Sequence, residues 1–164
     1  MKRLFLVGGT MGVGKTTVCQ TLKKELPRSV FLDGDWCWDA NPFQVTEETK
    51  AMVLDNICHV LNNFLRCSAY EHIIFCWVMD RQAIIDAVLG GLDTGGCTVR
   101  RVSLTASAEA IRDRVNADIA RGVRTPDALE RSLARLPLYQ GLDTIKIDTT
   151  GKSVQAVSGE IASL

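Results

Sequence analysis

The chain has 164 residues, which is enough for one domain with a sizeable core and too few for two. Its 19 lysines and arginines balance 19 aspartates and glutamates, so no overall positive field favours nucleic acid, although a local basic patch stays open. The six cysteines form no C-x-x-C pair, no apolar stretch approaches the length of a membrane span, and the start lacks a signal-peptide pattern. We therefore expect one cytoplasmic domain over residues 1–164, with reduced thiols, several of them buried, and no membrane contact.

The first predicted strand, residues 4–7, is a short apolar run of the kind found in buried parallel sheets. Residues 9–16 follow it as GTMGVGKT, a full match to G-x-x-x-x-G-K-[ST], the phosphate-binding loop of nucleotide-binding proteins. Glycines let the backbone turn its N–H groups onto phosphate oxygens, and the helix predicted over 17–26 points its positive N-terminus at the same oxygens.

The whole loop and the first helical residue are expected to contact phosphates: Gly9, Thr10, Met11, Gly12, Val13, Gly14, Lys15, Thr16 and Thr17. Lys15 is expected to reach the β- and γ-phosphates, and the Thr16 hydroxyl is expected to bind Mg²⁺. A chance glycine-rich turn is the alternative, but strand, loop and helix occur in the required order.

A second predicted strand, residues 30–32, ends in Asp33-Gly34-Asp35. Ligands of open α/β sheets bind at the carboxyl ends of the strands. Phosphoryl transfer needs positioning, charge neutralisation and an acceptor for the hydroxyl proton, and two carboxylates on one turn suit that chemistry. An ordinary polar turn that closes the strand is the alternative.

Three aromatic residues follow this turn: Trp36, Trp38 and Phe43. Their rings either stack on a base or sugar face or bury a mobile segment, and the sequence does not decide between these. Thr46 is the predicted N-cap of a long helix. His59 lies on a polar line of that helix, for which a solvated face is favoured over a position in the cleft.

The third strand is predicted over residues 72–79 and the next helix over 80–89. Asp80 is interpreted as the N-cap of that helix rather than as a second Mg²⁺-linked carboxylate. Arg81 could point into the cleft toward an anionic acceptor.

The remaining elements continue the alternation of strand and helix. They are a strand at 98–104, a helix at 108–121, a helix capped by Thr125 with Pro126 at its first position, a strand at 144–147 and a helix capped by Ser153. Crossover connections of this kind indicate a parallel sheet with helices on both faces.

The chain resembles the small P-loop kinases, the group that includes shikimate, gluconate and adenylylsulfate kinases, chloramphenicol phosphotransferase and polynucleotide kinase. The motifs that carry the resemblance are the phosphate loop, Asp33-Gly34-Asp35, the arginines between 112 and 124, and the segment 147–150. The resemblance implies a three-layer α/β/α P-loop NTPase fold whose five-stranded parallel sheet has the order 2-3-1-4-5.

The resemblance also implies individual roles. Asp33 would lie near Mg²⁺, and Asp35 would be the general base for the acceptor hydroxyl. A short lid around 115–126 would close over ATP, with Arg121 reaching the phosphates as a catalytic residue beside Lys15 and Asp35.

Two further residues, Arg114 and Thr149, are implied to lie by the adenine. The alternative for Arg114 is an i,i+4 pair with Asp118 on a solvated helix face. That solvated interpretation is favoured for three other arginines: Arg112, Arg131 and Arg135.

The sequence therefore predicts a Mg²⁺-assisted, ATP-dependent kinase of a small-molecule or nucleotide acceptor. The acceptor could be a nucleoside, a sugar-like acid or an antibiotic, and the protein a monomer or a homodimer. A regulatory nucleotide-binding ATPase without a small acceptor is the alternative from another class. A polynucleotide 5′-end kinase is less favoured because the net charge is zero.

Overall fold

The computed structural model describes residues 1–164 and contains one five-stranded parallel sheet. The strands are β1 (Lys2–Gly8), β2 (Ser29–Asp33), β3 (His72–Cys76), β4 (Cys97–Thr105) and β5 (Ile145–Asp148). Their order is β2-β3-β1-β4-β5, which confirms the order implied by the family resemblance. None of the helices combines the length and hydropathy that crossing a membrane requires.

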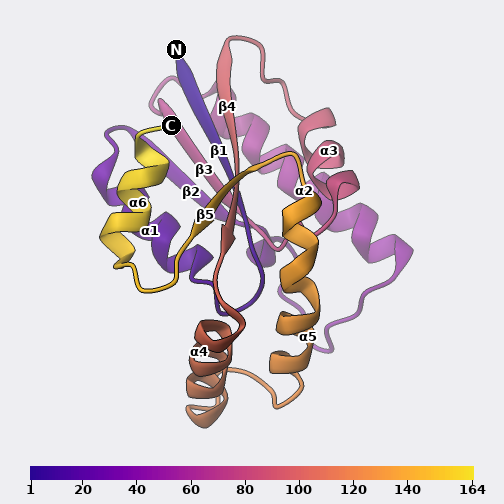
Figure 1. Ribbon diagram of the computed structural model, residues 1–164. Helices are drawn as coiled ribbons and strands as arrows, with labels where there is room; N and C mark the ends of the chain where they lie inside the picture. Colours follow the sequence, from indigo (N-terminus) through magenta and orange to yellow (C-terminus); the bar gives the residue numbers. More distant parts are fainter.

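The helices cover both faces of this sheet (Figure 1). They are α1 (Lys15–Glu25), α2 (Glu47–Arg66), α3 (Gln82–Gly90), α4 (Ala108–Ala120), α5 (Ala128–Arg135) and α6 (Val154–Ala162), with the 3-10 helices η1 (Gly34–Trp38) and η2 (Leu136–Gly141). Figure 1 shows α1 and α6 on one side, α2 and α3 on the other, and α4 and α5 beyond the carboxyl ends of the strands.

The central strand β1 explains why two apolar cores form. Successive side chains of a strand point to opposite faces. Phe5 and Val7 therefore join the core under α1, α4 and α6, whereas Leu4 and Leu6 join the core under α2 and α3. All four are at most 1% exposed. A strand that is apolar on both faces belongs in the middle of a parallel sheet.

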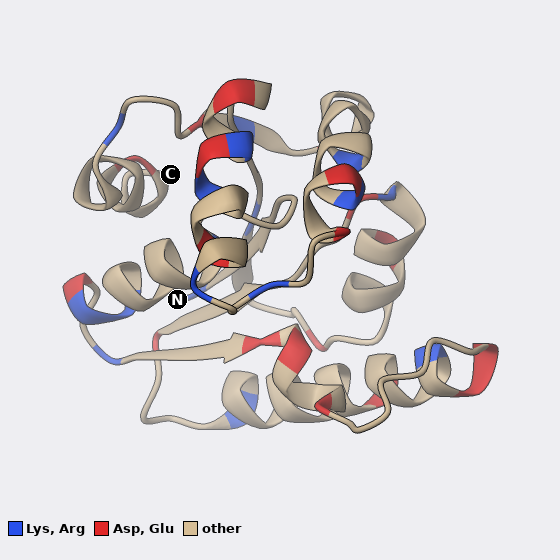
Figure 2. Ribbon diagram, turned by 90° about the horizontal axis from the view of Figure 1, so that it is seen from below, with Lys and Arg blue, Asp and Glu red and all other residues tan.

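The strand register brings the chemistry-bearing turns to one edge of the sheet. Cys76 at the end of β3 is paired both with Val7 of β1 and with Asp33 of β2. The phosphate loop after β1 and the acidic turn after β2 therefore emerge at the same edge. Figure 2 views this end and shows the acidic end of β2 and, nearer the viewer, the basic loop that joins α4 to α5.

The prediction that the third strand reaches residue 79 is wrong, because pairing ends at Cys76. Beyond Cys76 the chain leaves the sheet and is held by individual hydrogen bonds. Trp77 donates its backbone N–H to the Val7 carbonyl at 3.2 Å, and the Tyr139 hydroxyl donates to the Val78 carbonyl at 2.6 Å. Met79 adopts a positive φ of 41° and turns the chain toward α3.

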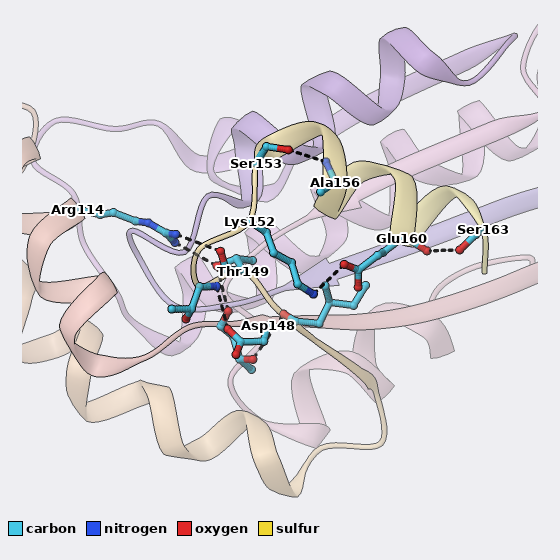
Figure 3. A network of polar contacts seen from close by, with 11 residues as sticks. Arg114, Asp148, Thr149, Lys152, Ser153, Ala156, Glu160 and Ser163 are labelled. Atoms are coloured by element: carbon cyan, nitrogen blue, oxygen red, sulfur yellow. Dashed lines mark hydrogen bonds and ion pairs between the residues drawn. The ribbon is translucent and has the colours of Figure 1, made fainter.

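Two of the predicted helix caps are confirmed. The Thr46 hydroxyl accepts from the Thr49 N–H at 3.1 Å, and the Ser153 hydroxyl accepts from the Ala156 N–H at 3.1 Å (Figure 3). All six cysteines are free, and the two that are buried are Cys19 and Cys76.

Two other predicted caps are wrong. Helix α3 begins at Gln82 after Arg81 without a side-chain cap, because the Asp80 carboxylate pairs instead with Arg135 at 3.4 Å. Helix α5 begins at Ala128, later than predicted. Thr125 and Pro126 form the preceding turn, in which the Thr125 hydroxyl bonds to the Asp127 carboxylate.

Candidate active site

The phosphate-binding loop connects β1 to the N-terminus of α1. Gly14 precedes that helix with a φ of 101°, and Gly12 has a φ of 81°, both in the region that favours glycine. A Cβ on Gly12 would also lie 2.6 Å from the Val115 side chain of α4. The turn therefore needs glycine at both positions for its backbone angles. At Gly12 it also needs glycine for the close approach to α4.

Lys15 lies inside this loop rather than on the surface. Its ammonium donates to the carbonyls of Gly9 at 2.7 Å and Thr10 at 3.0 Å. Burial lowers the pKa of Lys15, and the Asp35 and Asp33 carboxylates act in the opposite direction. An ammonium held this way by its own loop faces the place where the motif binds phosphate.

A buried serine of α5 fixes the loop from outside the motif. The Thr10 hydroxyl, which is fully buried, donates to the Ser132 carbonyl at 2.8 Å and lies 3.1 Å from the Ser132 hydroxyl. The Ser132 hydroxyl in turn donates to the Met11 carbonyl at 2.6 Å. The loop backbone is thus tied to the helix that follows the proposed lid.

Thr16 and Asp33 are brought together as a pair of oxygen ligands. The Thr16 hydroxyl donates to Asp33 Oδ2 at 2.8 Å, and Asp33 is only 7% exposed. No group of three or more His, Cys, Asp or Glu side chains could hold a metal by itself. Mg²⁺ commonly takes one or two protein oxygens and completes its shell with water and phosphate oxygens. The Thr16–Asp33 pair therefore fits Mg²⁺ together with a nucleotide.

Asp35 is the second residue of η1, two positions beyond Asp33, and hydrogen bonds join it to Asp33 and to Trp77. Its backbone N–H donates to Asp33 Oδ1 at 3.0 Å, and its own Oδ1 accepts the Trp77 indole N–H at 3.2 Å. Desolvation and then the Asp33 charge raise the pKa of Asp35, while Lys15 and the Trp77 N–H lower it. A carboxylate with a raised pKa, close to the charge of the half-buried Lys15, is suited to accept a proton.

Aromatic rings line the site next to Asp35. Trp38 meets Trp77 edge to face, with centroids 5.9 Å apart, and meets Phe43 in the same way at 4.9 Å. Trp77 also covers Gly34, where a Cβ would lie 2.6 Å from the indole. Trp36 instead contacts Phe31 and is 55% exposed.

Arg114 joins α4 to the phosphate loop and to the turn after β5. Its guanidinium donates to the Val13 carbonyl at 3.3 Å and to the Thr149 hydroxyl at 3.1 Å, as Figure 3 shows for the contact with Thr149. Thr149 is 3% exposed and donates to the Thr105 carbonyl at 3.0 Å. The alternative i,i+4 pair of Arg114 with Asp118 is not formed.

Asp118 instead binds the two arginines that follow it. Arg121 lies 2.5 Å from Asp118 Oδ1, and Arg124 lies 3.0 Å from Oδ2. The Arg121 side chain is 69% exposed and the Arg124 side chain 30%. Arg124 is also close enough to Lys15 for its charge to lower the pKa of that lysine. Of these two arginines, Arg124 is the less exposed.

The solvated interpretation is wrong for one of the three other arginines. Arg135 is 33% exposed and pairs with Asp80, whose side chain is 14% exposed. Arg131 is half exposed and pairs with Asp127 within the same helix. Arg112 is exposed, as expected.

A cavity of ≈ 580 Å³ lies between η1 and α2. Its lining residues are Leu32, Trp36, Cys37, Asp55, Asn56, His59 and Val60. Asn56 of α2 donates to the Cys37 carbonyl of η1 at 2.9 Å and so joins the two elements that border it. His59 borders this open pocket and is itself exposed, as are Asn56 and Asn63, which confirms the expected solvated helix face.

Ser132, Trp77 and Arg124 contact this site but were not singled out as site residues from the sequence. Ser132 and Trp77 are separated from the loop and from Asp35 by 122 and 42 residues, and neither lies in a motif. Arg124 could have been found from the sequence, because it belongs to the basic cluster at the end of α4. The spacing from Arg114 favoured Arg121 instead.

Comparisons with known proteins agree with this geometry. A family model described as an AAA domain matches residues 6–133. The shikimate kinase of Bacillus cytotoxicus is 30% identical over 97% of this chain and 96% of that enzyme.

Solved structures share the fold at lower identity. The tunicamycin resistance protein of Deinococcus radiodurans is 21% identical, with a TM-score of 0.71 over 99% of this chain and 95% of that one. APS kinase of Mycobacterium tuberculosis, solved with AMPPNP and APS, is 13% identical, with a TM-score of 0.66 over 99% and 96%. With its phosphate loop, its sheet order and its relatives in agreement, the chain belongs to the AAA-domain family and is a small P-loop kinase.

Proposed function

We propose that this kinase transfers the γ-phosphoryl group of ATP, with Mg²⁺, to a hydroxyl of a small-molecule or nucleotide acceptor. The observation that carries the proposal is the chain of contacts from Thr16 through Asp33 to Asp35, beside Lys15. It provides oxygen ligands for a metal, a cation for phosphate and a carboxylate for the acceptor proton within one site.

Each residue has a separate role in this proposal. Lys15 and the backbone amides of residues 9–17 hold the phosphates, and Thr16 and Asp33 hold Mg²⁺, which supplies neutralisation of phosphate charge. The acceptor oxygen bonds to the γ-phosphorus as the bond from that phosphorus to the bridging oxygen of ADP breaks. The hydroxyl proton passes to the Asp35 carboxylate, and ADP leaves.

The opposite end of the nucleotide would lie against Arg114 and Thr149. Their mutual bond at 3.1 Å, and the bond from Arg114 to the loop, support a rigid wall there. Residues 115–126 form the proposed lid, from which Arg121 and Arg124 supply positive charge to the γ-phosphoryl group.

Lys15→Ala tests the nucleotide half of the proposal. We expect ATP affinity or turnover to fall at least tenfold, about 1.4 kcal/mol or more, because the main side-chain cation facing the phosphates is lost. Lys24→Ala is the matched control, since Lys24 lies on the same helix and is exposed. The measurements are ATP binding by calorimetry and release of ADP.

Transfer is then measured with and without a panel of acceptors. Turnover that rises with an acceptor and yields a phosphorylated product supports a kinase with a small acceptor. ATP turnover independent of every acceptor would instead indicate the regulatory ATPase. Equal ATP binding by folded Lys15→Ala and Lys24→Ala proteins would remove the basis of the proposal.

A further inference from the structure

We propose that the acceptor carries no net negative charge: it is a neutral or cationic hydroxyl compound whose ring face packs against Trp38 and Trp77. This inference rests on the proposed function, because it concerns what is delivered to Asp35. It narrows an acceptor class that the phosphate loop leaves open.

The first reason is the shape and chemistry of the wall beside Asp35. Trp77 donates to the Asp35 carboxylate at 3.2 Å, and Trp38 lies edge to face with both Trp77 and Phe43. Phe43 is 56% exposed, and the two tryptophans are partly exposed. A hydroxyl placed on Asp35 therefore brings the rest of its molecule against indole and phenyl surface. Such surface binds the apolar face of a ring, and it binds cations through the negative ring face.

The second reason is charge. Residues 33–60 contain six carboxylates and one lysine, and that lysine, Lys50, pairs with Glu47 at 3.0 Å. The carboxylates are Asp33, Asp35, Asp39, Glu47, Glu48 and Asp55. Asp33 and Asp35 lie at the site itself, and their charges disfavour the binding of an anion beside them.

The cations at the site do not compensate for these carboxylates. Lys15 is bound within the phosphate loop, and Arg124 is paired with Asp118 on the lid. In the proposed function both bind phosphates of the nucleotide. Arg135 is paired with Asp80. None of these three cations is therefore free to bind a carboxylate beside Asp35 with two hydrogen bonds.

Arg81 is the one cation through which an anionic acceptor could still be bound. It precedes α3, is exposed and makes no ion pair or side-chain hydrogen bond. Three residues, including the turn at Met79, separate it from Trp77 along the chain. Arg81→Gln therefore distinguishes the two acceptor classes directly.

The test uses a metabolite extract separated by ion exchange into anionic, neutral and cationic fractions. Each fraction is incubated with the full-length protein and γ-labelled ATP, with Lys15→Ala and Asp35→Asn proteins as blanks. We expect label to enter a product from the neutral or cationic fraction at least tenfold above both blanks. Label confined to products from the anionic fraction would overturn the inference and leave the kinase proposal standing. No labelled product from any fraction would instead contradict the proposed function itself.

The labelled acceptor is then purified and used with two variants. We expect Trp38→Leu to raise the KM for the acceptor at least tenfold while the KM for ATP stays within twofold, and Arg81→Gln to change neither. All three tryptophans, Trp36, Trp38 and Trp77, flank Asp35, so acceptor binding should also quench the intrinsic fluorescence. The inference would be overturned if Arg81→Gln lost phosphoryl transfer and Trp38→Leu kept it.

Discussion

The two aspartates of the Asp33-Gly34-Asp35 turn have the same side chain and different surroundings. Asp33 is buried and accepts bonds from the Thr16 hydroxyl and from the backbone of Asp35. Asp35 keeps contact with solvent and accepts a bond from Trp77. In the proposed function the first carboxylate therefore holds the loop and a metal, whereas the second accepts a proton.

Asp35→Asn separates catalysis from stability. We expect phosphoryl transfer to fall about 10²- to 10⁴-fold, the usual contribution of a general base, with ATP affinity nearly unchanged. The pKa of Asp35 is raised above its ordinary value of 3.8, so the folded state favours the protonated acid. The stability that this contributes is present below that value and is lost as pH rises through the raised pKa.

At pH 7 the charged Asp35 is thus unfavourable for the nucleotide-free fold, and Asp35→Asn should melt at the same temperature or higher. The difference should shrink as pH falls toward 4, which thermal melts at several pH values will show. A variant that transfers phosphate at the wild-type rate would make Asp35 a turn residue and place the base elsewhere.

At this scale the sequence assigns Thr16 and Asp33 to one metal, and that role stays a prediction. Their side chains do bond to each other, although they come from different elements. The sequence could not supply Trp77 or Ser132, because their contacts depend on a register and a helix packing that no local pattern encodes. The misread caps at Asp80 and Thr125 have the same origin: a distant arginine and a neighbouring carboxylate bind the side chains that local preference assigned to helix ends.

At the scale of elements, α5 is coupled to the phosphate loop by buried hydrogen bonds. Ser132 is fully buried, and its hydroxyl is the donor to the Met11 carbonyl. Because α5 follows the proposed lid, the position of that segment would be connected to the loop geometry through Ser132.

Ser132→Ala should remove one net hydrogen bond, about 1 kcal/mol of unfolding free energy, and loosen the loop backbone. We expect the Kd for ATP to rise severalfold, as measured by calorimetry. Ser158→Ala is the matched control, since Ser158 is equally buried and bonds Glu25 on α1. If both variants lose stability alike and neither changes ATP affinity, Ser132 acts on the fold alone.

The loop between α4 and α5 presents two arginines that share Asp118. We expect Arg124→Ala to lower kcat at least tenfold, about 1.4 kcal/mol, because in the proposed function this less exposed guanidinium strengthens its contact as charge develops on the phosphoryl group. Arg121→Ala should lower kcat less, since that side chain is more exposed, and both variants remove one bond to Asp118. Single-turnover transfer rates compare them, and the opposite ranking would assign the phosphate contact to Arg121.

At the scale of the molecule, the sheet and the lid differ in how they are held. Five paired strands and two apolar cores fix the carboxyl edge on which the phosphate loop lies. The alternation of apolar segments predicted this architecture, because burial on both faces of a parallel sheet leaves a sequence pattern. The order of the strands came only through the family resemblance, since hydrophobicity does not distinguish one crossover from another.

The proposed lid has no comparable apolar anchor. Arg121, Gly122 and Val123 are exposed, and the segment is held by backbone hydrogen bonds to the end of α4 and by the bonds of its arginines to Asp118. A segment with few buried apolar contacts opens at low free energy. Phosphate charge would draw the same guanidinium groups inward and would thereby order the segment.

We therefore expect amides 118–126 to exchange with solvent faster than those of β1 in the nucleotide-free protein, and a non-hydrolysable ATP analogue to slow them at least tenfold. The exchange of β1 should change far less, which makes the strand an internal control in the same hydrogen-exchange experiment. Lys15→Ala, mixed with the same analogue, should lose the protection, because closure depends on bound phosphate. Equal exchange of 118–126 with and without the analogue, in protein shown to bind it, would return these arginines to a solvated surface and leave the site without a lid.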